Sequence, residues 1–420
     1  MRIGIVTETY SPEINGVALT VAGLVHGLAQ AGHAVQLIRP RQKSDGPAAA
    51  IEERIATTLV RGMRLPRYPG LQLGLPAGRR LRALWKSERP DALYVATEGP
   101  LGMSALRAAR DVGIPASTGF HTRFDDFARH YGLGALTSLV FAYLRRFHGL
   151  GAATFVPTVE LAEFLGGRGF HNVVRLPRAV DTNLFCPSKR DEALRAQWGV
   201  GADQLAVIYV GRIAPEKNLP LAVRTFRAIQ RLIPRARYIW VGDGPARAAL
   251  EAQNPDFIFA GVKSGEELAR HYASSDLFVF PSLTETFGNV TLEALASGVL
   301  TVAFDYGAAR EYLTSACGRR VARGDDDGFA AAACLLASDA VAFAAARTAA
   351  RRCVAHLEPA TVVANFVRAL AELSGAGNAQ SAPADSIDPA AAPRREGDES
   401  AAVSTAPARA ECRGSLPVHP

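Results

Sequence analysis

The chain lacks the residue patterns that build disulfide frameworks, thiolate metal sites or membrane spans. Its five cysteines are scattered and odd in number, without a C-x-x-C pair, which argues against a disulfide frame or a thiolate zinc site. No stretch has eighteen consecutive apolar residues, and "MRIGIVTE" lacks the charged and then apolar layout of a signal peptide. We therefore expect a cytoplasmic protein.

Lysine is also scarce, since only five of the 420 residues are lysine and arginine carries most of the positive charge. The formal net charge of +7 and the pI of about 9.3 suit an anionic partner. Nucleotide phosphates, an acidic membrane face and nucleic acid all fit that charge equally well. Because lysine is scarce, a lysine inside a motif carries more weight than usual.

Short apolar runs alternate with helical segments along most of the chain. The runs are "RIGIVTE", "AVQLIRP", "DALYVA", "GIPAST", "ATFVPT", "LAVIYVGR", "RYIWVGDG", "DFIFAG", "DLFVFPS" and "VLTVAFD". Strands separated by helices form parallel, doubly wound sheets, and strands that are apolar throughout are covered on both faces. The fold class is therefore α/β, and two such series in a chain of this length predict two Rossmann-like domains.

The composition suggests where these domains begin and end. Pro177 and Pro187 interrupt the pattern, so we place an N-terminal domain over residues 1–180 and a C-terminal one over residues 181–355. A last segment, residues 356–374, contains the helix "PATVVANFVRALAEL" and is expected to pack back on the N-terminal domain. Residues 375–420 are rich in Ala, Pro, Ser, Gly and charge, which predicts a disordered tail.

In doubly wound sheets ligands bind beyond the carboxyl ends of the strands, so the loops that follow strands are the candidate sites. After the first strand, Asn15 and Gly16 immediately precede a helix. A glycine there lets a main-chain N–H approach an oxyanion at the helix N-terminus. A simple turn that starts a helix explains the same residues.

The loop "GRIAPEKN" places Arg212 and Lys217 around a proline bend after another strand. Two cations at the carboxyl end of a strand can converge on a diphosphate, although a solvated surface pair is the alternative. The turn "WVGDGP" resembles a fragment of the G-x-G-x-x-G fingerprint but is incomplete. We interpret it as a tight turn.

The stretch "ETFGNVTLE" follows a strand and enters a helix, with Glu285 in the loop and Glu293 within the first turns of the helix. Main-chain N–H groups at Phe287, Gly288 and Asn289 can face phosphate or sugar oxygens. The two carboxylates can accept hydrogen bonds from sugar and ribose hydroxyls. The alternative is structural, with Glu293 satisfying a buried main-chain group and Glu285 a surface acid near a helix cap.

His121 lies just past the strand "GIPAST", at the expected interdomain cleft. A packed histidine and a functional one are about equally compatible with that position. Arg123, Arg129, Arg145 and Arg146 lie nearby among aromatic and aliphatic residues. That stretch is suited to an anionic membrane surface or to an ordinary solvated helix face.

The segment "RGDDDGF" contains Asp-x-Asp, a spacing used to hold a divalent metal against phosphates. Here it follows a short strand and precedes an alanine-rich helix, where aspartates act as N-caps and complement the helix dipole. We therefore expect no metal and no cofactor, with cations and main-chain amides neutralising phosphates instead.

These motifs together resemble the retaining glycosyltransferases of family 4, which have the GT-B fold of two Rossmann-like domains facing across a cleft. The resemblance runs from Met1 to about Leu373. It rests on "NGV" after the first strand, "FHT" around His121, "GRIAPEKN", "VGDGP" and the E-x7-E motif "ETFGNVTLE". Many relatives carry Gly-Gly where this chain has Asn15-Gly16.

The resemblance implies a role for each matching residue. Gly16 would line the donor diphosphate, Arg212 and Lys217 would grip it, and Val262 would lie near the nucleobase. Glu285 would contact the donor sugar, Glu293 the ribose, and the main chain from Phe287 to Asn289 the sugar and phosphate. His121 would approach the transferred sugar from the opposite domain.

The first half, including "RLPRYPGLQLGLP", resembles a bacterial branch of GDP-mannose-dependent α-mannosyltransferases and of sulfoquinovosyl and glucosyl transferases acting on diacylglycerol. This implies metal-independent hexose transfer, mannose being favoured, from a nucleotide sugar to a lipid or glycan acceptor. Peripheral contact with the inner face of the cell membrane would follow, and no nucleic-acid partner. The alternatives are UDP-sugar-dependent glucosyl or sulfoquinovosyl transfer to diacylglycerol and a GT-B sugar-nucleotide epimerase.

Overall fold

The computed structural model describes residues 1–375 except 14, 43–44, 46–50, 65–71 and 122–136. Several sequence predictions concern residues outside this range. They are those for Thr122, Arg123 and Arg129, for most of "RLPRYPGLQLGLP", and for the tail from residue 376 onward.

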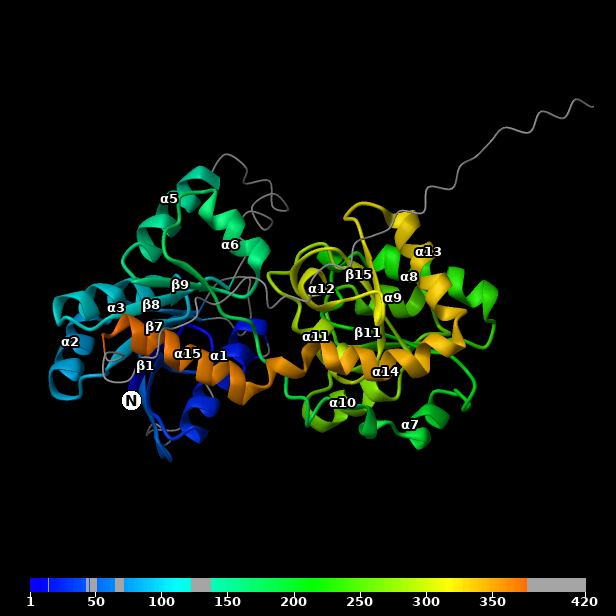
Figure 1. Ribbon diagram of the computed structural model, residues 1–420, viewed down its shortest axis with the longest axis horizontal. Coiled ribbons are helices and arrows are strands. Elements are labelled where there is room, and N and C mark those ends of the chain that lie inside the picture. Colours follow the sequence, from blue (N-terminus) through cyan, green and yellow to red (C-terminus); the bar gives the residue numbers. More distant parts are fainter. Residues whose placement is uncertain (14, 43–44, 46–50, 65–71, 122–136, 376–420) are drawn as a thin grey trace, which may run out of the picture. The chain divides into compact units, whose positions relative to one another are not determined.

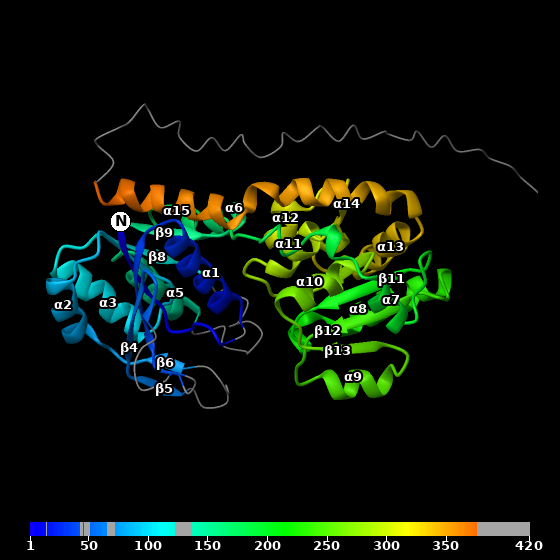
Figure 2. The same ribbon diagram turned by 90° about the horizontal axis from the view of Figure 1, so that it is seen from below.

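The N-terminal half is built on an eight-stranded sheet with the strand order β10-β9-β8-β7-β1-β2-β4-β3. All neighbouring strands are parallel except β3, which runs antiparallel to β4. The strands are β1 (Arg2–Val6), β2 (Ala34–Pro40), β3 (Ile51–Glu52), β4 (Ile55–Val60), β7 (Ala92–Val95), β8 (Ala116–Gly119), β9 (Ala153–Val156) and β10 (Val173–Arg175). Strands β5 (Gly62–Arg64) and β6 (Gln72–Gly74) form a separate antiparallel pair (Figure 2).

Helices cover both faces of this sheet because its strands alternate their side chains between two apolar layers. Ile3 and Ile5 pack with α1 (Gly16–Gln30) and α15 (Pro359–Leu373). Val6 packs on the other side, with α2 (Gly78–Ser87) and α3 (Pro100–Asp111). A third cluster joins α5 (Thr137–His148) to α6 (Val159–Gly166). The helix α15 thus lies beside the N-terminal strands, drawn in orange in Figure 1, although it is the last helix of the described chain.

The C-terminal half is a six-stranded, wholly parallel sheet with the order β13-β12-β11-β14-β15-β16. Its strands are β11 (Ala206–Val210), β12 (Arg237–Val241), β13 (Ile258–Gly261), β14 (Leu277–Phe280), β15 (Leu300–Phe304) and β16 (Gly318–Val321). The chain leaves β11 toward β12 on one side and returns to β14 on the other. This reversal makes the β11–β14 edge the topological switch point, where such sheets bind ligands.

The helices of the C-terminal half pack on one continuous apolar core that includes most residues of β11, β12, β14 and β15. They are α7 (Glu192–Gln197), α8 (Leu219–Leu232), α9 (Arg247–Gln253), α10 (Gly265–Ala273), α11 (Asn289–Ala296), α12 (Gly307–Tyr312), α13 (Asp326–Ala337) and α14 (Ala340–Val354). Helix α8 contacts α13, and α11 contacts α14. Short 3-10 turns lie at η2 (Pro187–Lys189), η3 (Pro215–Lys217) and η4 (Ala355–Leu357).

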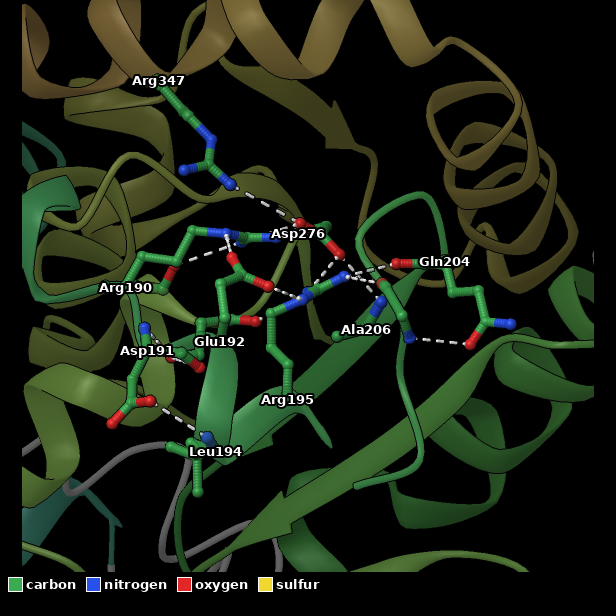
Figure 3. A network of polar contacts seen from close by, with 12 residues as sticks. Arg190, Asp191, Glu192, Leu194, Arg195, Gln204, Ala206, Asp276 and Arg347 are labelled. Atoms are coloured by element: carbon green, nitrogen blue, oxygen red, sulfur yellow. Dashed lines mark hydrogen bonds and ion pairs between the residues drawn. The ribbon is translucent and has the colours of Figure 1, made fainter. Parts of the chain in front are cut away.

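A buried polar network ties α7 to the start of the C-terminal sheet (Figure 3). The guanidinium of Arg195, which is fully buried, donates to Asp276 Oδ2 over 2.9 Å. The same carboxylate oxygen accepts from the N–H of Ala206 in β11 over 2.9 Å, and the other approaches Arg190 and Arg347. One carboxylate just before β14 therefore holds together a helix, a strand and two further arginines.

Two chain crossings join the halves. The first, residues 176–186, leads from β10 toward η2, and the second leads from α14 through η4 into α15. They bond to one another, since the N–H of Val180 donates to Leu357 O over 2.9 Å and Thr182 Oγ1 donates to Glu358 over 2.7 Å.

All ten strands predicted from apolar runs are present, and so is the helix predicted at "PATVVANFVRALAEL". The ten apolar runs did not include β3, β4, β5, β6, β10 and β16. Of these, β4 carries two threonines, β16 carries two arginines, and the others are only two or three residues long. Asp325 is confirmed as a helix cap, because its side chain accepts from the N–H of Gly328 over 2.8 Å. Within the described residues, no helix combines the length and the apolarity that a membrane span needs.

Candidate active site

Lys217 and Glu285 meet at the switch point of the C-terminal sheet. Lys217 ends the turn η3 after β11, and Glu285 lies in the loop after β14, so the topology brings residues 68 positions apart into an ion pair. Their side chains are 15% and 18% exposed, and Ser282 Oγ donates to Glu285 over 2.9 Å. A mostly buried cation therefore stands at the place where doubly wound sheets bind phosphates.

Arg212 lies in the same loop but is oriented differently from Lys217. Its guanidinium is 61% exposed and pairs with Glu216 one helical turn further on. The sequence predicted that Arg212 and Lys217 converge. In the structure each cation instead has its own carboxylate partner, so convergence on a diphosphate would require Arg212 to leave Glu216.

The residues Phe287, Gly288 and Asn289 form the entry into α11, as the sequence predicted. Gly288 is the N-cap with φ of 92°, a left-handed conformation that favours glycine. It provides no side-chain cap, so the first turn of α11 keeps main-chain N–H groups available to a ligand. Phe287 is buried, and its carbonyl accepts from Ala308 over 2.7 Å, which fixes the loop against α12.

Glu293 lies on the next turn of α11 and faces α10. The hydroxyl of Tyr272 donates to Glu293 Oε2 over 3.1 Å. Burial raises the pKa of the Glu293 carboxyl to about 7, although the Tyr272 hydrogen bond acts in the opposite direction. The structural alternative gave Glu293 a buried main-chain group as its partner, whereas in the structure its carboxylate accepts from the side chain of Tyr272.

In the N-terminal half, Asn15 and Gly16 start α1. The side chain of Asn15 accepts from the N–H groups of Val17 and Ala18 over 3.1 and 2.8 Å and donates to Thr9 over 2.8 Å. Two first-turn amides are thereby occupied, which corresponds to the simpler alternative of a turn that starts a helix. The role of Gly16 toward a diphosphate stays a prediction.

His121 follows β8 and is held on both sides of its ring. Its Nε2 lies 2.8 Å from the hydroxyl of Tyr94, and Nδ1 lies 3.4 Å from Arg178 Nη2. Arg178 can only donate, so Nδ1 accepts and the proton of the neutral ring resides on Nε2. Burial, and secondarily the Arg178 charge, lower the pKa of His121 to about 3. The ring is therefore neutral at physiological pH.

Arg178 is a candidate functional residue that the sequence did not single out. It lies in the crossing that follows β10 and is only 7% exposed. Its guanidinium donates to the carbonyl of Gly16 over 3.2 Å and to Asn289 Oδ1 over 3.3 Å, besides approaching His121. An arginine between two prolines in a linker carries no motif signal, so only the fold could identify it.

A cavity of about 330 Å³ collects several of these side chains. His121, Arg178, Asn289 and Glu293 line its polar part. Leu19, Leu24, Leu176, Val362 and Val363 belong to its apolar part. The lining comes from α1, the 176–181 crossing, α11 and α15, so loops from both sheets contribute to it.

Val262 and the turn "VGDGP" complete the predicted set. Val262 follows β13 and is 53% exposed, so its side chain is available to a ligand. Gly242 and Gly244 allow the turn after β12 to lie against the loop after β11, where a Cβ would come within 2.0 Å of Gly211 O and 2.3 Å of Ile213 O. The glycines therefore allow the two loops to approach closely, and a turn closes just after them, where the N–H of Arg247 donates to Gly244 O over 3.1 Å.

Metal ligands do not gather in the described part of the chain, where no three His, Cys, Asp or Glu residues come together in a suitable cluster. Buried or half-buried cations and helix N-termini surround the candidate site instead.

Comparison with known proteins identifies the family. Residues 14–184 match the model described as Glycosyltransferase Family 4, and residues 204–339 match the one described as Glycosyl transferases group 1. A GDP-mannose-dependent α-mannosyltransferase of Mycobacterium tuberculosis is 35% identical over 320 residues, which cover 75% of this chain and 82% of the relative. This chain belongs to the family 4, or group 1, glycosyltransferases.

Two further comparisons extend this result. An α-monoglucosyldiacylglycerol synthase of Acholeplasma laidlawii is 28% identical over 320 residues, covering 71% of this chain and 79% of that one. The sucrose-phosphate synthase of Thermosynechococcus elongatus superposes with a TM-score of 0.73 at 18% identity, covering 89% and 99% of the two chains. The predicted fold class is confirmed: this glycosyltransferase has the GT-B fold of two parallel-sheet α/β domains.

Proposed function

We propose that this glycosyltransferase moves mannose from GDP-mannose to a lipid or glycan acceptor. One observation carries the proposal: Lys217 and Glu285 pair at the switch point of the C-terminal sheet, and the loop that carries Glu285 leads into α11, which carries the buried carboxyl of Glu293. A diphosphate sugar needs a cation for its phosphates and acceptors for its hydroxyls, and this arrangement offers both. The similarity to the mycobacterial α-mannosyltransferase supports the donor.

In this proposal the donor diphosphate replaces the internal partners of the loop cations. Lys217 exchanges Glu285 for a phosphate oxygen, and Arg212 leaves Glu216 to do the same. Glu285 is then released to accept a hydrogen bond from a sugar hydroxyl. Gly16 contributes main chain beside the diphosphate from the opposite half.

The remaining donor contacts come from α11 and the β13 loop. The main-chain N–H groups from Phe287 to Asn289, at the start of α11, bind sugar and phosphate oxygens. Glu293 accepts from the ribose hydroxyls, and Val262 contacts the nucleobase. His121, neutral with its proton on Nε2, contacts the transferred sugar.

The reaction we propose retains the anomeric configuration. The bond from C1 of the sugar to the diphosphate oxygen breaks, and the acceptor oxygen attacks C1 from the same face through an oxocarbenium-like transition state. The acceptor proton passes to the leaving diphosphate. We propose that cations and main-chain amides stabilise that leaving group, with neither a metal nor a cofactor.

The test compares two substitutions in a transfer assay with labelled GDP-mannose and a membrane lipid extract as acceptor. Lys217→Ala should weaken GDP binding and lower kcat/KM by about 10²–10³-fold, the effect typical of removing one preorganised charge-stabilising donor. Glu285→Ala should abolish transfer while GDP affinity changes little. Unchanged turnover in both variants would refute the site. Loss of activity with chelator, restored by magnesium, would refute the metal-free mechanism.

A second candidate is transfer from a UDP-sugar, glucose or sulfoquinovose, to diacylglycerol, which the similarity to the Acholeplasma synthase favours. Thermal shifts with GDP, UDP and their sugars distinguish the donors, because the bound nucleotide stabilises the folded chain. An epimerase would release a changed sugar without acceptor, so an acceptor-free incubation that yields no such product excludes it.

We further propose that the enzyme is cytoplasmic and contacts the inner face of an anionic membrane through α5, without a nucleic-acid partner. Leu139 is 68% exposed and Tyr143 41% exposed, and Arg146 continues the same helical face one turn later. Leu139→Asp should reduce sedimentation with vesicles containing anionic lipid while leaving turnover on a water-soluble acceptor intact. Equal sedimentation of both proteins would contradict this role.

A further inference from the structure

Arg178 contacts three of the loops that carry family motifs, although it belongs to none of them. It reaches Gly16 and Thr20 at the start of α1, Asn289 at the start of α11 and His121 after β8. The first and third of these loops belong to the N-terminal half and the second to the C-terminal half. A single side chain from the crossing between the halves therefore lies where both halves present their candidate donor loops.

The charge of Arg178 is not balanced by the described residues. All four hydrogen-bond acceptors are uncharged, namely a carbonyl, a hydroxyl, an amide oxygen and a ring nitrogen. Within the described part of the chain no carboxylate accepts from it, and its buried Nε–H has no partner. Burial lowers the pKa of the guanidinium to about 10, which still leaves it charged. A buried cation without a counter-charge is costly unless an anion binds to it.

Three features of its surroundings favour an anionic ligand. Arg178 lines the cavity of about 330 Å³, so a ligand can reach it. The N-termini of α1 and α11 both lie within hydrogen-bonding reach of its Nη1, and both add positive potential. Glu285 raises the pKa of Arg178 from a distance, but its carboxylate is already paired with Lys217 and leaves the charge of Arg178 to a ligand.

We propose that Arg178 is a donor-binding residue that supplies a hydrogen-bonded positive charge to the diphosphate of the nucleotide sugar. The inference rests on the proposed function, because it takes the anion to be the donor diphosphate. Nη2 carries a second N–H besides the one that faces His121, and this second N–H is the donor available for a phosphoryl oxygen. The buried Nε–H stays without a partner among the described residues. Arg178 thereby adds a cation from the crossing between the halves to Lys217 and Arg212, the two cations of the C-terminal loop.

The same placement gives Arg178 a second effect on the site. Because it donates to Nδ1 of His121, it fixes the Nε2-protonated tautomer of that ring while it binds the anion. Binding of the diphosphate is thus coupled to the orientation of a residue that contacts the transferred sugar.

The test measures binding of GDP and of guanosine to Arg178→Met, Arg178→Lys and a control, Arg168→Met. Met keeps much of the side-chain volume without the charge, Lys keeps the charge without the fork, and Arg168 is a surface arginine whose loss changes net charge equally. We expect Arg178→Met to weaken GDP about 10- to 100-fold, Arg178→Lys less, and the control under twofold. Guanosine should bind all four proteins within about twofold.

Two results would overturn the inference. One is GDP affinity in Arg178→Met equal to that of the wild type. The other is an equal loss for GDP and guanosine, which would mean that Arg178 only supports the loops. The UDP and uridine pair replaces GDP and guanosine if the wild type prefers uracil. If the wild type binds neither nucleotide, the proposed function itself fails, whereas a binding wild type with an unaffected variant overturns only the role of Arg178.

Discussion

The two sheets have the same kind of switch point but use it differently. In the C-terminal sheet the loops after β11 and β14 bring Lys217 and Glu285 into an ion pair. In the N-terminal sheet the loops after β1 and β7 meet at Glu8, whose N–H donates to Thr97 Oγ1 over 2.9 Å. One switch point therefore carries opposite charges, and the other carries two carboxyls, the buried one of Glu8 and that of Glu98 in the loop after β7, whose side chain is 9% exposed.

The residues around Glu8 show that its carboxyl has a structural role. Its Oε1 accepts from the N–H of Leu101 over 2.9 Å in the first turn of α3. The carboxylate therefore caps a helix that follows β7 in the sequence, although Glu8 itself follows β1. Gly99 leaves room for the carboxylate, since a Cβ there would lie 2.1 Å from its oxygens. The comparison teaches that topology places side chains at a switch point, while the neighbouring residues decide whether they face a ligand or the fold.

The hydrophobic cores of the two halves also differ, in how many clusters their buried residues form. The C-terminal half has one continuous cluster, in which Tyr209, Tyr238 and Trp240 pack ring against ring. The N-terminal half divides its buried residues among three clusters, one of which includes Phe366 and Leu370 from α15. We therefore expect the C-terminal half to unfold as one unit and the N-terminal half to depend on a helix from the end of the described chain.

The largest expected effect tests the unity of the C-terminal half. Asp276→Ala removes the hydrogen-bonded carboxylate partner of the fully buried Arg195. The guanidinium then keeps hydrogen bonds only to carbonyls, with the exposed Glu192 carboxylate 3.5 Å away. Losing one member of a buried ion pair costs about 3–5 kcal/mol. We expect a decrease of that size in the free energy of unfolding, measured by urea denaturation.

The matched control is Glu192→Ala, since that carboxylate also approaches Arg195 but is 62% exposed. It should cost under about 1 kcal/mol. Hydrogen exchange should accelerate together in peptides covering β11 and β14 of Asp276→Ala. Acceleration confined to α7 would contradict a single cooperative core.

The second prediction concerns the dependence of the N-terminal half on α15. Phe366 is fully buried, and its ring packs against Tyr94 at 5.2 Å and Phe155 at 5.4 Å between centroids. Phe366→Ala should cost about 3 kcal/mol because a Phe-sized cavity opens in the core. Hydrogen exchange should accelerate in β1 and β7 peptides and stay unchanged in β11.

Val367→Ala, one position along the same helix and only partly buried, should cost clearly less. If Phe366→Ala instead accelerated exchange equally in both sheets, the halves would not be separable folding units.

The smallest expected effect compares the two buried carboxyls. Burial raises the pKa of both Glu8 and Glu293 to about 7, whereas an ordinary glutamate loses its proton near pH 4.5. Between these values the unfolded chain releases a proton that the folded chain keeps, so stability falls as the pH rises. Glu293→Gln removes this dependence. The free energy of unfolding of the variant, compared with that of the wild type, should therefore be higher at pH 8 than at pH 5 by about 1–3 kcal/mol.

Glu8→Gln should show the same pH trend in the other half, offset by the weaker cap that an amide gives α3. Urea midpoints between pH 5 and pH 8 measure both variants. A difference from the wild type that is the same at both pH values would show that neither carboxyl titrates as the burial implies.

Much of the fold could be predicted from the sequence because the strands are short, apolar and separated by helical segments. The site residues show which features could be predicted in this way and which could not. The sequence before α11 correctly predicted that Glu285 lies in the loop, Gly288 at the start of the helix and Glu293 within it. Local turn and capping rules decide these positions. Spacing alone could not show that Arg212 is exposed and paired with Glu216, because loop residues five apart can point in any direction.

The sequence by itself determined that strands and helices alternate in two series and that the motif residues follow strands. These properties depend on local periodicity and turn chemistry, which adjacent residues set. Only the tertiary structure decided which loops meet: Lys217 with Glu285, Glu8 with the start of α3, and Arg178 with three loops. Contacts between distant segments follow from the strand order and from packing, and no run of neighbouring residues encodes them.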